Sequence, residues 1–223
     1  MEFSGKKYTV GVIAGTSVDT NMGVACLEKA GIKAVGLDVI DDPLKNTSAQ
    51  VLNPEGLERE MELKIKGLID NYSIGSVIIY CNSLSTAVNL GRLRAKAKVP
   101  VVTPLETYAE VAGRYNRVGI MAANCQALAG IEKTILEVNE RIYITGTAFI
   151  MLVVAIEKKY SPAKIIREYG LLEVLDFYRK LNTEVLVLGC THFPYLKEEL
   201  AKFTDIHIYD PGEAMIAKIK SMI

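Results

Sequence analysis

The sequence predicts an α/β fold built from two pseudo-symmetric domains, each a parallel sheet flanked by helices. Short apolar, β-branched runs alternate with longer amphipathic runs, which is typical of parallel strands joined by crossover helices. The sequence also repeats itself: residues 10–14 resemble 118–122, and residues 77–83 resemble 186–192, at offsets of 108 and 109 positions. Because both offsets are about half of the 223 residues, we expect two similar halves with an active site in the cleft between them.

The apolar runs fix the expected strands and the division of the chain. The predicted strands are residues 8–14, 34–40, 76–80, 99–103, 118–122, 142–145, 184–188 and 206–209. Helices are expected between them, for example after Asn53 and after Ser161, where a proline follows a capping side chain and an apolar stripe begins. We expect residues 1–97 together with 207–223 to form the first half, and residues 98–206 to form the second.

Composition and charge narrow the class of protein. The 26 Lys and Arg residues balance 26 Asp and Glu residues, so no excess positive charge is available for nucleic acid, and no phosphate-binding glycine loop indicates a nucleotide. The most apolar stretch, residues 148–156, is too short to span a membrane. Residues 1–7 contain no apolar leader, and the four cysteines show no short paired spacing. The sequence therefore predicts a cytoplasmic protein with reduced thiols and no membrane segment.

Two cysteines occupy repeat-related positions that suit chemistry. Cys81 and Cys190 directly follow predicted strands, and the carboxyl ends of parallel strands are where ligands bind. Two thiols on opposite sides of a cleft can invert a stereocentre, because one removes a proton as a thiolate while the other returns a proton to the opposite face. Each cysteine leads into a segment with helix-capping residues, whose free N–H groups stabilise an anion, and His192 lies near enough to Cys190 to pair with its thiolate.

The motifs around these cysteines resemble those of a known family. Residues 81–83 read CNS, similar to the CNT motif, and residues 189–194 read GCTHFP, similar to the GCTHFP or GCTHYP motif of the aspartate/glutamate racemase superfamily. The resemblance implies a cofactor-independent amino-acid racemase, commonly a homodimer, with Cys81 and Cys190 as the acid/base residues. His192 matches the histidine of the glutamate branch, which favours glutamate over aspartate as the substrate.

The resemblance also implies a set of substrate-binding residues. Asn82, Ser83 and Thr191 would hold the carboxylate and amino groups of the amino acid. The family's DSGxGG segment is altered, however, because residues 14–20 read AGTSVDT. The expected aspartate is missing at residue 14 or 15, and Asp19 stands too far along to be equated with it. The sequence-based candidates in this loop and its counterpart in the second half are Thr16, Ser17 and Asn124.

Several other interpretations remain open. Cys26 and Cys125 are expected to be bystanders, and Lys45 is expected to lie in a solvated loop. Zinc held by Cys81, Cys190 and His192 is disfavoured because no fourth ligand is evident and the opposed thiols would lie too far apart. A hydantoin racemase, another isomerase acting on an α-proton, and a noncatalytic amino-acid-binding module are the alternatives to the amino-acid racemase.

Overall fold

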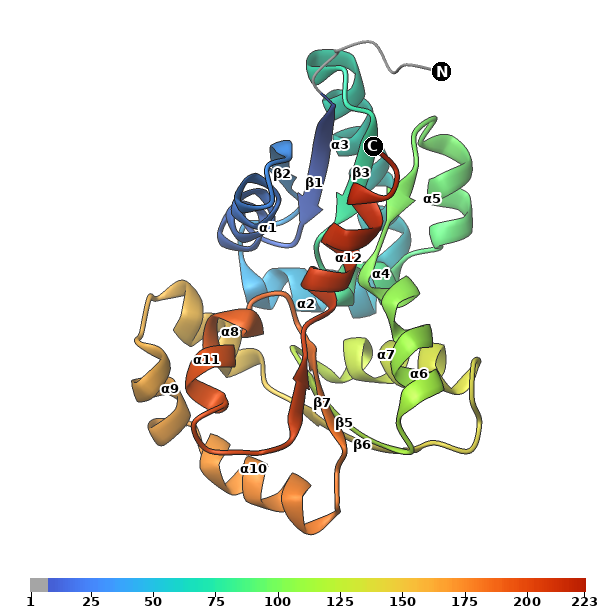
Figure 1. The fold of residues 1–223 in the computed structure, drawn as a ribbon. Coiled ribbons are helices and arrows are strands. Elements are labelled where there is room, and N and C mark those ends of the chain that lie inside the picture. The colour runs from blue at the N-terminus through green and yellow to red at the C-terminus, as the bar shows by residue number, and fades with distance from the viewer. Residues whose placement is uncertain (1–7) are drawn as a thin grey trace.

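The computed structural model describes residues 8–223, and the segment 1–7, for which no apolar leader is expected, lies outside that range. Eight strands form two parallel four-stranded sheets with the orders β2-β1-β3-β4 and β6-β5-β7-β8. The strands are β1 Thr9–Ala14, β2 Lys33–Asp38, β3 Ser76–Ile79, β4 Val101–Val102, β5 Arg117–Ala122, β6 Tyr143–Ala148, β7 Val185–Gly189 and β8 His207–Tyr209. The identical strand order confirms the predicted pair of similar α/β halves (Figure 1).

Helices connect and cover the strands. The helices of the first half are α1 Ser17–Lys29, α2 Pro43–Leu52, α3 Pro54–Tyr72, α4 Asn82–Ala87 and α5 Leu90–Lys96. The chain continues through the short 3-10 helix η1 Pro104–Thr107, then α6 Tyr108–Arg114, α7 Cys125–Leu136, α8 Ile150–Glu157, α9 Pro162–Glu168, α10 Leu171–Lys180, η2 Phe193–Leu196, α11 Lys197–Leu200 and α12 Pro211–Lys220. The two helices expected after Asn53 and Ser161 begin where the sequence indicates, each capped by that side chain and followed by proline.

The central strands explain why the sheet pattern is readable in the sequence. All six residues of β1 are buried, as are all five of β7, because helices cover both faces of each parallel sheet. Such strands need continuous apolar runs, and these runs are what the sequence analysis detected. The edge strand β4 is reduced to two paired residues, whereas β6 continues to Ala148, beyond the predicted end at residue 145.

The sheets divide the chain differently from the expected domain boundaries. Strand β4 pairs with β3, so residues 98–102 continue the first half, and β8 pairs with β7, so residues 207–209 belong to the second sheet. The chain then returns to the first half as α12, which contacts α1, η1 and β4. The expected boundaries failed here because β4 and β8 lie at the ends of the halves, where sequence alone does not show which sheet a short strand joins.

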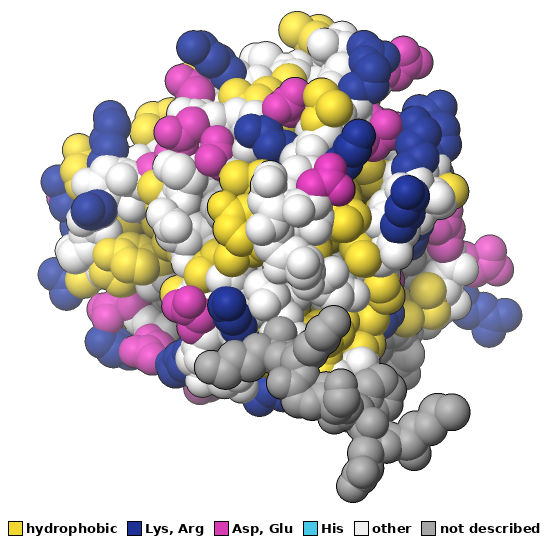
Figure 2. Space-filling model, turned by 90° about the horizontal axis from the view of Figure 1, so that it is seen from above, with side chains coloured by type: hydrophobic (Ala, Val, Ile, Leu, Met, Phe, Trp, Pro, Cys, Tyr) yellow, Lys and Arg dark blue, Asp and Glu magenta, His cyan; other side chains and the backbone are white. Residues whose placement is uncertain are grey.

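Contacts between the halves bring the strand ends together. Helix α4 of the first half packs on α7 of the second, and α2 contacts α8. Figure 1 shows α2 and α4 at the junction of the two sheets, and α12 rising from the junction over the first sheet. On the face drawn in Figure 2, acidic and basic side chains are both spread over the surface with apolar side chains between them. Among the helices in residues 8–223, none combines the length and the apolar character needed to cross a membrane.

Candidate active site

A small cavity lies at the junction of the two halves. The cavity has a volume of about 30 Å³ and is partly open to solvent. The loop after β1, helix α2 and the end of β3 supply the wall from the first half, and the ends of β5 and β7 with helix α8 supply the wall from the second. The lining residues are Gly15, Thr16, Asp19, Pro43, Asn46, Thr47, Gln50, Cys81, Asn82, Ser83, Ala123, Asn124, Ile150, Val153, Gly189, Cys190, Thr191 and His192.

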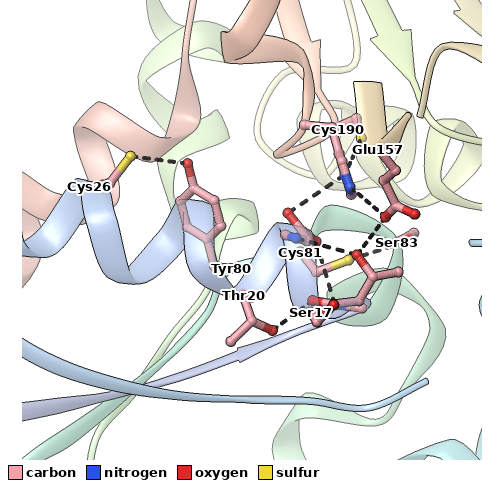
Figure 3. A network of polar contacts seen from close by, with 12 residues as sticks. Ser17, Thr20, Cys26, Tyr80, Cys81, Ser83, Glu157 and Cys190 are labelled. Carbon is pink, nitrogen blue, oxygen red and sulfur yellow. Dashed lines mark hydrogen bonds and ion pairs between the residues drawn. The ribbon is translucent and has the colours of Figure 1, made fainter. Parts of the chain in front are cut away.

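The cavity contains both cysteines that the repeat singled out. Cys81 follows β3 and is the N-cap residue of α4, and Cys190 follows β7. Both side chains are buried, and each thiol has a different polar neighbour (Figure 3). The Cys81 sulfur lies 3.3 Å from the Ser83 hydroxyl, and the Cys190 sulfur lies 3.8 Å from His192 Nδ1. The two halves therefore present one thiol each to the same cavity.

The surroundings of Cys81 oppose its ionisation. Burial raises the pKa of the Cys81 thiol, and the nearby Asp19 carboxylate raises it further. The Ser83 hydroxyl and the backbone N–H of Leu84 act in the opposite direction, because they can hydrogen-bond to a thiolate. The charge on Cys81 thus depends on which hydrogen-bond donors and positive groups approach it inside the cavity.

His192 is the centre of a buried charge cluster. Its Nε2 atom lies 3.0 Å from Glu157 Oε1, and its Nδ1 atom lies 3.7 Å from Asp19 Oδ1. Burial lowers the pKa of His192, but Asp19, Cys190 and Glu157 outweigh that effect, so the pKa is raised well above its usual value. These neighbours favour the positively charged form of the imidazole, which stands beside the Cys190 sulfur.

Asp19 and Glu157 belong to this cluster, although the sequence analysis set Asp19 aside and did not consider Glu157. Helix α1 is capped by Thr16, whose hydroxyl accepts from the Asp19 N–H at 3.3 Å, and this places Asp19 in the first turn, facing the cavity. Burial raises the pKa of its carboxyl group, and the positive His192 opposes this. The capping pattern Thr16-x-x-Asp19 was a usable signal for this geometry. Glu157 had no such signal, since it reaches His192 and the Thr16 hydroxyl only through the fold.

The remaining predicted residues divide into two groups. Thr16, Asn82, Ser83, Asn124 and Thr191 all line the cavity together with the cysteines and His192. Ser17 and Lys45 are not among the lining residues. The backbone N–H of Ser17 donates to Asp41 in an exposed loop, because the helix start turns this residue away from the cavity. Lys45 is exposed in the first turn of α2, so its segment is helical where a loop was expected.

The structure also places the two cysteines that were expected to be bystanders. The half-buried Cys26 contacts the Tyr80 hydroxyl at 3.6 Å, and Cys125 is exposed at the start of α7, so neither lines the cavity. Within residues 8–223, no group of three or more His, Cys, Asp or Glu side chains is arranged to hold a metal ion.

Within residues 8–223, three buried polar atoms of the cavity have no partner at full hydrogen-bond distance: Asp19 Oδ1, Asn82 Nδ2 and Thr191 Oγ1. Two of them are close to each other, because the Thr191 hydroxyl lowers the pKa of the Asp19 carboxyl group. The Asn82 amide is otherwise held, because its Oδ1 accepts from the Tyr108 hydroxyl. An unpartnered buried polar atom is unfavourable unless something else satisfies it. One carboxylate acceptor and two neutral donors match the ammonium and carboxylate groups of an α-amino acid.

Comparisons with known proteins agree with this geometry. The family model described as Asp/Glu/Hydantoin racemase matches residues 71–219. Glutamate racemase from Aliivibrio fischeri is 30% identical over 165 residues, a match that covers 71% of this chain and spans only 61% of that relative. Among solved structures, glutamate racemase from Francisella tularensis in complex with D-glutamate superposes with a TM-score of 0.77 at 19% identity, covering 97% of this chain and 81% of that one.

A second structure has nearly the same extent as this chain. Picrophilus torridus aspartate racemase superposes with a TM-score of 0.70 at 22% identity, covering 96% of this chain and 94% of that one. The two structural matches confirm the fold, and the family model covers well over half of the sequence. The chain therefore belongs to the Asp/Glu/hydantoin racemase family.

Proposed function

We propose that the protein is a cofactor-independent racemase of a small acidic amino acid, with glutamate as the first candidate and aspartate as the second. The observation that carries the proposal is the pair of buried thiols, Cys81 and Cys190, that repeat-related strands bring to one cavity. A homodimer in the cytoplasm remains the prediction made from the sequence.

The unpartnered atoms of the cavity support the binding step. The Asp19 carboxylate would accept hydrogen bonds from the substrate ammonium, while Asn82 and Thr191 would donate to the α-carboxylate. These contacts would hold the α-carbon between the two sulfur atoms. The ammonium would also offset the negative charge of Asp19, which otherwise raises the pKa of Cys81.

The proton transfers then follow from the two thiols. In one direction the Cys81 thiolate takes the α-proton and becomes a thiol, and the electron pair of the broken C–H bond stays on the α-carbon. The Cys190 thiol gives a proton to the opposite face and becomes a thiolate beside the positive His192. In the other direction the two thiols exchange roles. Donors to the substrate carboxylate stabilise the charge that develops between these steps.

The residues of the cavity wall that would contact the substrate side chain determine which amino acid is accepted. None of the lining residues is Lys or Arg, so a side-chain carboxylate would be held by neutral donors from residues such as Asn46 and Thr47. The part of the wall formed by Asn46 and Thr47 is uncharged and would equally suit an uncharged ring, which keeps hydantoin racemisation as the second candidate function. A binding module that has lost turnover would keep these contacts but show no proton exchange.

Proton NMR in D₂O tests the proposal. Reduced protein without added cofactor is incubated with L- and D-glutamate, L- and D-aspartate and a set of hydantoins, and loss of the α-proton signal is followed. We expect exchange with glutamate, and we expect Cys81→Ser and Cys190→Ser each to reduce racemisation at least about a hundredfold. Cys26→Ser and Cys125→Ser are the matched controls. Full activity of either site variant would exclude the two-thiol mechanism, and exchange only with hydantoins would select the second candidate.

A further inference from the structure

Gln50 of α2 is a cavity residue to which the proposed reaction gives no role. It is only 3% exposed, and both ends of its amide are hydrogen-bonded. Its Oε1 atom accepts from Asn124 Nδ2 at 2.9 Å, across the junction of the two halves. Its Nε2 atom donates to the Ser83 hydroxyl at 2.9 Å and to Asn46 Oδ1 at 3.2 Å. Ser83 in turn lies 3.3 Å from the Cys81 sulfur.

The direction of this hydrogen-bonded chain is fixed from the second half. The backbone N–H of Ala127 donates to Asn124 Oδ1 at 2.8 Å, so the NH₂ group of Asn124 must face Gln50. An NH₂ group needs an acceptor, and Gln50 therefore presents its oxygen to Asn124 and its own NH₂ group to Ser83. The Ser83 oxygen accepts that bond, which leaves the hydroxyl hydrogen free to point at the Cys81 sulfur.

We propose that Gln50 is a positioning residue that holds the Ser83 hydroxyl as a hydrogen-bond donor to the Cys81 thiolate, with its own orientation set by Asn124. This inference rests on the proposed function for the role of Cys81 as a base. A hydrogen bond to the charged form of an acid favours that form, so the chain of amides favours the thiolate at one cysteine only.

The two thiols are therefore supported in different ways. The titratable groups around the cavity are Asp19 from α1, Glu157 from α8, and Cys190 and His192 after β7. Cys190 has His192 as its neighbour, whereas Cys81 faces Ser83, Asp19 and Cys190. Gln50 contacts none of these titratable groups through a hydrogen bond. Its removal should change the ionisation of Cys81 and leave that of Cys190 as it was.

The rate of thiol alkylation as a function of pH measures this directly. Reduced protein is treated with iodoacetamide over a pH series, and the alkylated fractions of the Cys81 and Cys190 peptides are quantified by mass spectrometry. In Gln50→Met we expect the rate at Cys81 to fall about tenfold at a fixed pH, equivalent to a profile displaced by about one pH unit to higher pH. The Cys190 profile in the same samples should not move.

The chain offers a matched control. Gln126 of α7 donates to the Thr86 hydroxyl of α4 at 3.1 Å, so it is likewise a glutamine bonded to a hydroxyl group of α4, but it leads to no cysteine. Gln126→Met should leave the Cys81 profile unchanged. An unmoved Cys81 profile in Gln50→Met, or equal displacement of both cysteines, overturns the proposal.

Variants of Ser83 test whether Gln50 acts through it. Ser83→Ala should move the Cys81 profile in the same direction, Ser83→Thr should restore it, and adding Gln50→Met to Ser83→Ala should have no further effect. An additional displacement of the Cys81 profile in the double variant would contradict the proposal that Gln50 acts through Ser83. If Gln50→Met does not fold, Gln50→Glu serves instead, because its carboxylate would accept the Ser83 hydrogen and withdraw it from the sulfur. Alkylation requires no turnover. If Gln50→Met displaced the Cys81 profile but the natural protein showed no racemisation, the proposed function would be rejected and the role of Gln50 in positioning Ser83 would stand.

Discussion

The charges inside the cavity come from three side chains that lie far apart in the sequence. His192 lies between Glu157 and Asp19, whose carboxylates favour its positive form. Asp19 also acts on its own wall of the cavity, where it raises the pKa of Cys81. A single carboxylate thus influences the proton on both sides of the cavity, in opposite halves of the molecule.

Replacing Asp19 tests this double influence. In Asp19→Asn the pKa of His192 should fall, because the Asp19 carboxylate is the largest of the charges that raise it. The pKa of Cys81 should fall as well, because the same carboxylate raises it. His192 would then lose its positive charge at a lower pH than in the natural protein. We also expect kcat/KM for racemisation to fall about tenfold or more, since the substrate ammonium loses a charged acceptor.

NMR titration of the imidazole signals measures the histidine effect. The chain has only two histidines, so the signals are few, and the exposed His207 provides the reference. An unchanged His192 titration in Asp19→Asn would show that the two side chains are not coupled. Unchanged kcat/KM would remove Asp19 from the binding step.

At the scale of residues, local motifs predicted only part of the site. Cys81, Asn82, Cys190 and Thr191 were found because strand ends and short motifs mark them in the sequence. Glu157 and Gln50 were not, since their partners Thr16 and Asn124 are 141 and 74 positions away. No periodicity within a helix indicates which residue of a distant segment it will contact.

At the scale of elements, the contact between α4 and α7 is what brings the first half against the second. Gly130 of α7 faces Thr86 of α4 so closely that an added Cβ would lie only 2.4 Å from the Thr86 Cβ. No side-chain rotation removes a clash between two Cβ atoms, so one of the helices would have to move. Helix α4 begins directly after Cys81, and any such movement reaches the cavity.

Gly130→Ala should therefore destabilise the protein. We expect the free energy of unfolding to fall by about 1–3 kcal/mol, as is usual for overpacked contacts, measured by urea denaturation followed by circular dichroism. Gly67→Ala is the matched control, because Gly67 lies within α3 and an added Cβ there meets nothing within 4 Å. The control should gain up to about 1 kcal/mol from helix propensity. Equal effects of the two changes would contradict the close approach of α4 and α7.

The elements themselves were the most predictable part of the fold. Buried parallel strands such as β1 and β7 require apolar residues on both faces, so their sequences are unambiguous. The edge strand β6 has no fully buried residue, and the sequence predicted its end three residues before the observed end at Ala148. Packing between elements, such as that of Gly130 against Thr86, depends on distances that no sequence pattern encodes.

At the scale of the whole molecule, the chain passes from the first half to the second after β4 and returns after β8. The returning helix α12 buries Met215 and Ile219 against Val10, Val12 and Ile78 of the first sheet. The repeat predicted two halves correctly but gave no information on this return, because α12 follows the second sheet and packs on the first. We expect this arrangement to make the two halves unfold together.

Met215→Ala tests that expectation. The side chain is fully buried, so its truncation should reduce the free energy of unfolding by about 2–5 kcal/mol. Met222→Ala, in the same C-terminal segment but partly exposed, should have little effect. The reactivity of Cys81 and Cys190 towards iodoacetamide in increasing urea reports the unfolding of each half separately. Both cysteines should become reactive at one urea concentration, lower in Met215→Ala than in the natural protein. If Cys81 became reactive first while Cys190 stayed protected, the halves would be independent and α12 would stabilise only the sheet on which it packs.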